Sequence, residues 1–231
     1  MPRARSGISS PIPSVKFNEA LREILNRAID HFGPQNWWPA DSPFEVMVGA
    51  ILTQNTNWLN TKRAIENLKQ AGILNPHLIL KRRRILPRLI RPAGYYQLKS
   101  QRLINFVRYL IQQYRGSITR MRQRPLFMLR KELLALPGIG PETADSILLY
   151  ALNKRIFVID AYTRRILSRH NLISGDEDYD QLRIRCEENL PKRISIYKEL
   201  HAQLVMIGKT FCRRNDPHCS DCPIADLRGL S

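Results

Sequence analysis

Residues 136–144 read Leu-Pro-Gly-Ile-Gly-Pro-Glu-Thr-Ala, a glycine-rich turn between two stretches with helical periodicity. Gly138 and Gly140 lack a Cβ, so the turn can adopt positive φ and bring its backbone close to a bulky partner. Pro141 suits the first position of the following helix, whose unpaired N–H groups form an anion site. We predict that this turn binds a phosphate group; a plain helix–helix connection is the alternative.

Helical periodicity continues on both sides of this turn. Apolar residues recur at steps of three and four in ten stretches, which are 15–32, 44–54, 59–71, 77–89, 99–114, 125–135, 142–152, 161–169, 178–189 and 193–207. Only residues 155–159 (RIFVI) resemble a strand, and one isolated run cannot make a sheet. The pattern therefore predicts an all-α protein.

We expect a two-lobed helical bundle. One lobe comprises residues 15–34 with 120–231 and contains the hairpin at 130–150 and a cysteine-rich loop at 212–222, while residues 35–119 form a central lobe. Residues 1–14 are predicted to be a flexible basic tail. Short breaks rich in Pro and Gly separate the helices, as is typical of a compact bundle.

The charge of the chain favours a polyanionic partner. Among its 231 residues, 37 Lys and Arg stand against 20 Asp and Glu, a net charge of +17. Such an excess promotes nucleic-acid binding through counterion release. The basic residues are scattered along the whole chain, unlike those of a membrane-binding helix. No apolar run approaches the ~20 residues that span a bilayer, so we expect no association with a membrane. We also expect the protein to be a monomer, cytoplasmic and associated with the nucleoid.

The four cysteines are unevenly placed. Cys186 stands alone, whereas Cys212, Cys219 and Cys222 follow a C-x6-C-x2-C pattern. A few clustered cysteines in an intracellular chain favour metal ligation over disulfides.

Asp160 is the candidate catalytic residue. It follows the apolar run 155–159 and opens the helix predicted at 161–169. As an N-cap it accepts a hydrogen bond from a backbone N–H, and that can be its whole role. In a cleft, the same carboxylate can stabilise a cationic sugar transition state or orient a water molecule.

Together these motifs resemble the endonuclease III superfamily of DNA glycosylases. Residues 136–145 (LPGIGPETAD) and 157–165 (FVIDAYTRR) are similar to its helix–hairpin–helix and catalytic-aspartate signature, and residues 43–56 (PFEVMVGAILTQNT) to its first core helix and DNA-probing loop. The similarity runs from Trp37 to Leu227. It implies that Asp160 is catalytic and that the DNA contacts are Gln54, Asn55, Gly138, Ile139, Gly140, Thr143 and Lys209.

Two positions depart from the superfamily pattern. Glu142 stands where members with lyase activity carry a lysine that attacks the sugar, and a carboxylate cannot form an imine. Ala50 stands where the adenine-excising members carry a catalytic glutamate. We therefore expect a monofunctional glycosylase of another specificity, in which Glu142 is catalytic or supports its helix near the positive end.

The segments 36–40 (NWWPA) and 91–96 (RPAGYY), with Glu142, resemble the members that excise 3-methyladenine. That base carries a positive charge, which weakens its glycosidic bond and lets electron-rich aromatic faces select it. The resemblance implies a base pocket of Trp37, Trp38 and Tyr95, or Tyr96 in its place. Core packing of the two tryptophans is the alternative.

The cysteine pattern resembles the start of the superfamily's 4Fe–4S motif, with one defect. The fourth cysteine is replaced by Arg228, which has no lone pair to offer iron. His218 and Asp226 are chemically suitable substitutes. An iron–sulfur cluster with an unidentified fourth ligand, a vestige of one, and a different metal site all remain open.

The sequence therefore predicts an enzyme that hydrolyses the N-glycosidic bond of a damaged, alkylated purine in double-stranded DNA. Two alternatives stay open. A glycosylase with lyase activity would use another lysine, for instance Lys131 or Lys154. A non-catalytic helix–hairpin–helix module would bind DNA and leave Asp160 without a chemical role.

Overall fold

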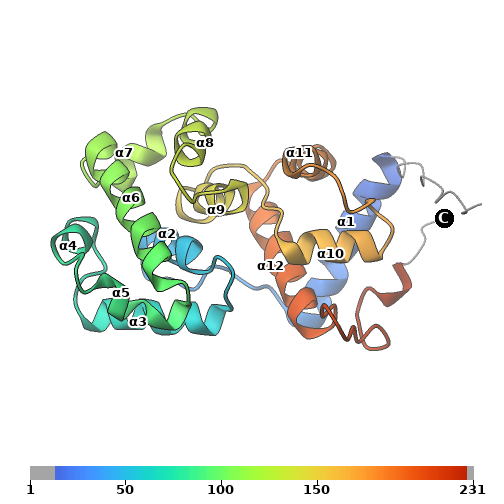
Figure 1. The fold of residues 1–231 in the computed structure, drawn as a ribbon. Helices are drawn as coiled ribbons and strands as arrows, with labels where there is room; N and C mark the ends of the chain where they lie inside the picture. Colours follow the sequence, from blue (N-terminus) through green and yellow to red (C-terminus); the bar gives the residue numbers. More distant parts are fainter. Residues whose placement is uncertain (1–13, 228–231) are drawn as a thin grey trace, which may run out of the picture. The chain divides into compact units, whose positions relative to one another are not determined.

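The computed structural model describes residues 14–227 (Figure 1). This part of the chain is helical and contains no strand, which confirms the all-α prediction. The strand-like run 155–159 forms no regular element and pairs with no strand in the described range. The predicted tail, residues 1–14, lies outside that range apart from Ser14, where the first helix begins, and Arg228 lies outside it as well.

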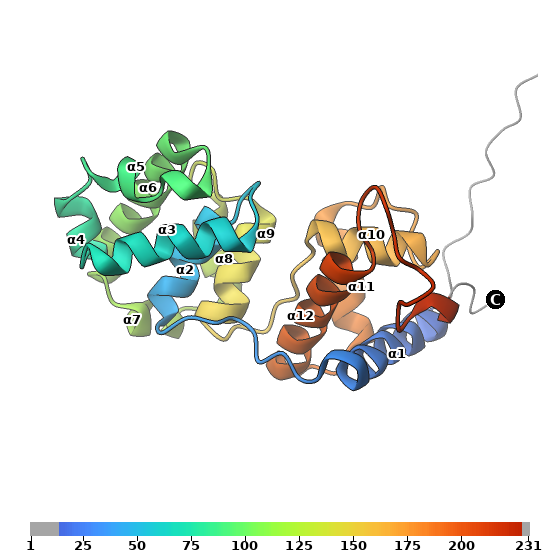
Figure 2. The same ribbon diagram turned by 90° about the horizontal axis from the view of Figure 1, so that it is seen from below.

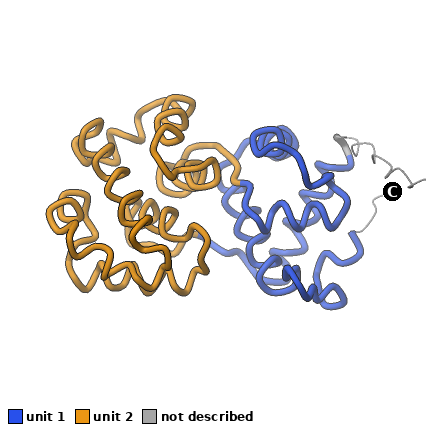
Figure 3. Tube along the Cα trace, viewed as in Figure 1, with its two compact units in different colours: residues 1–37, 159–231 blue, residues 38–158 orange. Residues whose placement is uncertain are grey.

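The described chain divides into two compact units, residues 14–37 with 159–227 (unit 1) and residues 38–158 (unit 2) (Figure 3). The boundary that we expected near residue 120 lies instead between Val158 and Ile159. The glycine-rich turn and its helices therefore belong with the central part of the chain rather than with its two ends. The physical reason is that the helix at 43–52 packs against the segment that follows the turn.

Unit 1 joins the two ends of the chain (Figure 2). Its helices are α1 (Ser14–Phe32), α10 (Ala161–Arg169), α11 (Tyr179–Asn189) and α12 (Ile194–Thr210), followed by the short η3 (Ala225–Leu227). The helix α12 packs against both α1 and α10. The apolar stripe of α1 is buried as predicted, with Phe17, Leu21 and Ile24 fully enclosed.

Unit 2 is built around a central helix. Its elements are α2 (Pro43–Leu52), α3 (Trp58–Gln70), α4 (Pro76–Lys81), α5 (Leu86–Leu89), η1 (Arg91–Ala93), α6 (Tyr96–Tyr114), α7 (Ile118–Gln123), α8 (Leu126–Leu134), α9 (Pro141–Ser146) and the π-helical η2 (Ile147–Ala151). All residues from Phe44 to Leu52 are buried. A helix that is apolar on every side must lie inside the fold, and α2 contacts α3, α6, α9 and η2.

Among the described residues, no helix is both long enough and apolar enough to cross a membrane.

Candidate active site and nucleic-acid interface

The predicted hairpin, a glycine-rich turn between two helices, is present in unit 2. Residues 135–140 connect α8 to α9, and Gly140 is the N-cap of α9 with Pro141 at its first position. Gly138 has φ +86°, a conformation that favours glycine. Gly138 and Gly140 are exposed, whereas the Ile139 side chain is buried. Any contact of Ile139 with a phosphate must therefore come from its backbone.

A buried ion pair clamps the two helices of this hairpin. Arg130 of α8 lies 2.8 Å from the carboxylate of Asp145 in α9, and Asp145 is fully buried. Because removal of either partner would leave an uncompensated charge, we expect substitution of Arg130 or Asp145 to loosen the packing of α8 against α9.

Gln54 attaches the end of α2 to the hairpin. Its Nε2 donates to the carbonyl of Gly138 and to Oγ1 of Thr143, each at 2.9 Å, while Arg102 donates to its Oε1. Gln54 and the buried Thr143 therefore have partners within unit 2, and their predicted contacts with DNA stay predictions. The next residue, Asn55, is exposed and has φ +52°.

A buried lysine that sequence reasoning missed holds two loops of unit 2. Lys99 donates from Nζ to the carbonyl of Leu52 at 2.8 Å and to that of Ala93 at 2.7 Å. Burial, with the nearby charge of Arg102, lowers the pKa of Lys99 to about 8. The two bonds tie the segment before Asn55 to the segment before Tyr95. Tyr95 is itself 70% exposed with φ +45°.

The two tryptophans predicted to share a pocket fall on opposite sides of the unit boundary. Trp38 belongs to unit 2, where its ring meets Trp58 and Tyr150 edge to face, each at 5.4 Å between centroids. Gly49 of α2 makes room for the indole, because a Cβ there would lie 3.2 Å from it. Trp37 belongs to unit 1 and lies under the ammonium of Lys209, 5.2 Å from the ring centroid.

Asp160 is the N-cap of α10 in unit 1. Its Oδ1 accepts a 2.7 Å hydrogen bond from the backbone N–H of Thr163. Its Oδ2 lies 3.6 Å from Nε2 of His201 in α12, a residue that sequence reasoning missed. Burial raises the pKa of Asp160, but His201 and the Thr163 amide outweigh burial and leave the pKa below its usual value. The capping prediction is confirmed.

Lys209 lies at the end of α12, within electrostatic range of Asp160. Burial lowers the pKa of Lys209, and the charge of Asp160 opposes this only in part. The two helices approach closely beside it, because a Cβ on Gly208 would lie under 3.0 Å from the ring of Tyr162. A glycine at this position therefore lets α12 bring its charged groups to the start of α10.

Comparison with known proteins identifies the family. Residues 48–192 match the HhH-GPD superfamily of base excision DNA repair proteins. This chain belongs to that superfamily. The match covers the hairpin and Asp160, so the predicted resemblance to DNA repair glycosylases is confirmed.

Several relatives of this HhH-GPD protein are known. A putative DNA repair glycosylase of Methanocaldococcus jannaschii is 46% identical over 90% of this chain and 96% of its own length. Endonuclease III of Thermotoga maritima is 27% identical, with 88% of each chain covered. The protein is therefore a DNA repair glycosylase of this superfamily.

Solved structures agree with the assignment. The crystal structure of a 3-methyladenine DNA glycosylase from H. pylori, bound to 1,N6-ethenoadenine, is 28% identical, with a TM-score of 0.72 over 86% of this chain and 98% of its own. An endonuclease III–DNA complex has a TM-score of 0.78 at 21% identity, over 91% of this chain and 94% of its own, and shares the fold.

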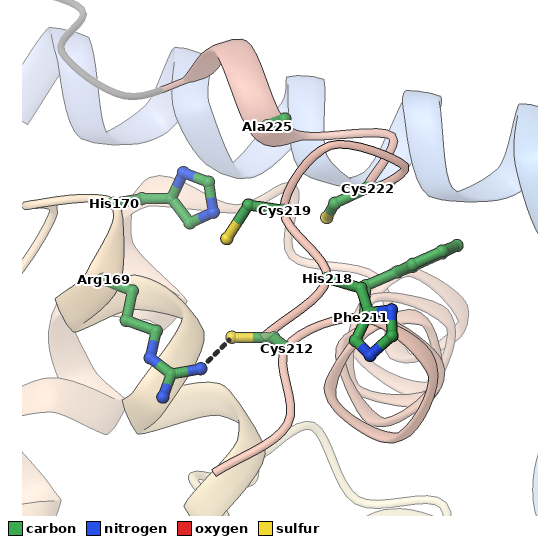
Figure 4. A pocket seen from close by; sticks show the side chains of 8 residues that line it. All are labelled: Arg169, His170, Phe211, Cys212, His218, Cys219, Cys222 and Ala225. Atoms are coloured by element: carbon green, nitrogen blue, oxygen red, sulfur yellow. Dashed lines mark hydrogen bonds between the residues drawn. The ribbon is translucent and has the colours of Figure 1, made fainter. Parts of the chain in front are cut away.

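In this HhH-GPD chain the three clustered cysteines line one pocket of unit 1 (Figure 4). The residues around it are Arg169, His170, Phe211, Cys212, His218, Cys219, Cys222 and Ala225. Arg169 donates to Sγ of Cys212 at 3.3 Å and to the carbonyls of Arg213 and Arg214, so it fastens the loop after α12.

The donor set is one thiolate short of the four that a 4Fe–4S cluster normally takes. Cys186 is buried in α11, away from this pocket, and burial raises its pKa to about 12. Of the two suggested substitutes, His218 lines the pocket but Asp226 does not, and Asp226 is paired with Arg27. Within the described range, no three acidic, His or Cys side chains stand in a metal-binding arrangement.

Glu142 is exposed in the first turn of α9, in the unit that does not contain Asp160. A carboxylate is favourable at the positive end of a helix, and the catalytic or supporting role of Glu142 stays a prediction.

Proposed function

We propose that the protein hydrolyses the N-glycosidic bond of an alkylated purine, such as 3-methyladenine, in double-stranded DNA, and that it acts as a monomer without lyase activity. The observation that carries the proposal is the nearly enclosed carboxylate of Asp160 at the start of α10, with Oδ1 bonded to the Thr163 amide and Oδ2 3.6 Å from Nε2 of His201. The similarity to an H. pylori enzyme named for 3-methyladenine supports the choice of base.

In the proposed reaction, the bond between C1′ and the base nitrogen breaks and its electron pair leaves with the base. The sugar becomes cationic, and the carboxylate of Asp160 stabilises this charge. Water then adds to C1′ and loses a proton. A positively charged alkylated base is a good leaving group, so no strong acid is needed to protonate it.

Recognition of DNA is assigned to the exposed groups. The backbone at Gly138 to Gly140 and the start of α9 would bind phosphate oxygens, and Asn55 would fill the space left by the everted nucleotide. Trp37, Trp38 and Tyr95 would contact the base. Tyr95 is well suited to this because its ring is exposed on a loop that Lys99 holds.

We base the proposed absence of lyase activity on the residue at the usual lysine position, Glu142, whose carboxylate cannot form an imine. Of the other lysines that we considered, Lys154 donates to the carbonyl of Arg124 at 2.8 Å, whereas Lys131 is exposed on α8.

The decisive experiment is release of free base from a methylated duplex. We expect 3-methyladenine to appear in solution, with the abasic strand left intact. Borohydride added to the protein on abasic DNA should trap no covalent complex, and trapping would establish the lyase alternative. Tight binding without release of base from alkylated, deaminated or oxidised duplexes would establish the non-catalytic alternative.

We further propose that Cys212, Cys219 and Cys222 hold an iron–sulfur cluster that cross-links the loop after α12. Because a fourth thiolate is lacking, no step of the reaction is assigned to it. The purified protein should contain iron and absorb visible light, and Cys219→Ser should reduce both. A colourless protein free of iron would contradict this proposal and leave the assignment of Asp160 untouched.

A further inference from the structure

His201 lies beside the catalytic candidate but belongs to a different helix. Its imidazole comes from the middle of α12, and its Nε2 lies 3.6 Å from Oδ2 of Asp160 at the start of α10. Both side chains are nearly enclosed, with 7% of His201 and 11% of Asp160 exposed. At such sites water screens charges weakly, so the two groups interact more strongly than a surface pair does.

Capping of α10 does not explain this arrangement. The cap requires only Oδ1 of Asp160, which accepts from the Thr163 N–H. Asp178 shows what capping alone looks like: it bonds to the backbone N–H groups of Asp180 and Gln181 at the start of α11, and it is exposed. Asp160, in contrast, is nearly enclosed, and its second oxygen lies 3.6 Å from an imidazole nitrogen.

We propose that His201 is the positioning residue of Asp160: it fixes the orientation of Oδ2 so that the carboxylate can act on the sugar. This inference rests on the proposed function, because it gives the same carboxylate a partner that prepares it. His201 does not need to touch the DNA.

The charges around Asp160 agree with this role. Four groups interact electrostatically with the Asp160 carboxylate. They are His201 and Lys209 from α12, and the Thr163 amide and the Tyr162 hydroxyl from α10. Burial works against ionisation of Asp160, and His201, whose Nε2 lies 3.6 Å from Oδ2, is the largest influence in its favour. Without His201 the pKa of Asp160 should rise. As the pH is lowered, activity should therefore be lost at a higher pH than in the wild type.

The test compares His201→Leu with His201→Gln in single-turnover base release across a range of pH. We expect His201→Leu to lower the maximal rate about 10- to 100-fold, as loss of positioning does. Its acid limb should move up by about one pH unit, because an opposite charge at this distance shifts a carboxyl pKa by that order. His201→Gln should recover part of the rate through its amide donor, but not the acid limb, because it carries no charge.

Gln203→Leu is the matched control. Gln203 is buried in the same helix and bonds to the carbonyl of Gly33 and to Glu199, away from Asp160. It should lower stability without moving the acid limb. If His201→Leu does not fold, the His201→Gln profile decides alone: an acid limb at the wild-type pH would overturn the inference.

A second measurement separates this inference from the proposed function. Titration of the Asp160 carboxyl by NMR, in the wild type and in His201→Gln, reports the pKa without any turnover. A wild type that releases no base from any duplex contradicts the proposed function, while an Asp160 pKa that rises in His201→Gln still supports the pairing. An active wild type whose Asp160 pKa and rate are unchanged in both His201 variants overturns the inference alone.

Discussion

Asp160→Asn is expected to lower base release from methylated duplex by about 10²- to 10³-fold, the usual cost of removing a group that stabilises transition-state charge. The amide has nearly the shape of the carboxylate and still accepts the Thr163 N–H, so the cap of α10 is kept. What is lost is the negative charge that faces the cationic sugar. Single-turnover release of 3-methyladenine measures the effect.

Asp178→Asn is the control for this substitution. Asp178 caps α11 in the same unit, so its replacement removes one charge at a capping position but leaves Asp160 intact. We expect its rate and its affinity for DNA to match the wild type. An Asp160→Asn protein with full activity would remove Asp160 from the mechanism.

Gly138→Ala is expected to damage the hairpin. At φ +86° an alanine is strained, and its Cβ would lie under 3.0 Å from the side chain of Arg102. Arg102 must then move, and its bond to Gln54, which holds the hairpin to α2, weakens. We expect the free energy of unfolding to fall by about 2 kcal/mol and the affinity for DNA to fall with it. Urea unfolding and DNA titration measure the two effects.

Gly140→Ala separates an effect on the stability of the fold from an effect on the affinity for DNA. Gly140 has φ −86°, and a Cβ there would meet nothing within 4 Å. Its stability should stay within about 0.5 kcal/mol of the wild type, as for most surface substitutions. If a DNA phosphate approaches the backbone at Gly140 closely, the affinity of the Gly140→Ala protein for DNA should still fall. Equal losses of stability in both glycine variants would contradict the strain assigned to Gly138.

The acid side of the stability profile depends on the same carboxylate. The pKa of Asp160 lies below its usual value, so its contribution to stability is present above the usual pKa of an aspartate and is lost as the pH falls through the lowered value. Lys209 has a lowered pKa, so its charged form costs stability at neutral and acid pH, and this cost is relieved only as the pH rises through that lowered pKa towards the usual value of a lysine.

Local patterns were sufficient for the helices, the hairpin and the cap at Asp160, because each depends on residues close together in the chain. Pro141 at the first position of α9 and the apolar steps of α1 are visible without any tertiary contact. The motif at 136–145 also led to the superfamily, which the match over residues 48–192 confirms. The run 155–159 resembles a strand in sequence but forms none, since no strand pairs with it in the described range, and the all-α prediction is unaffected.

Contacts between distant segments decided the rest. The hairpin belongs to unit 2 because α2, about ninety residues earlier, packs against α9 and η2 and bonds to the turn through Gln54. His201 and Lys99 carry no local signal, since one histidine or lysine in a helix resembles any other until packing encloses it. Burial beside a charge or a carbonyl gives each its role, because only the folded chain removes the water that would otherwise solvate them.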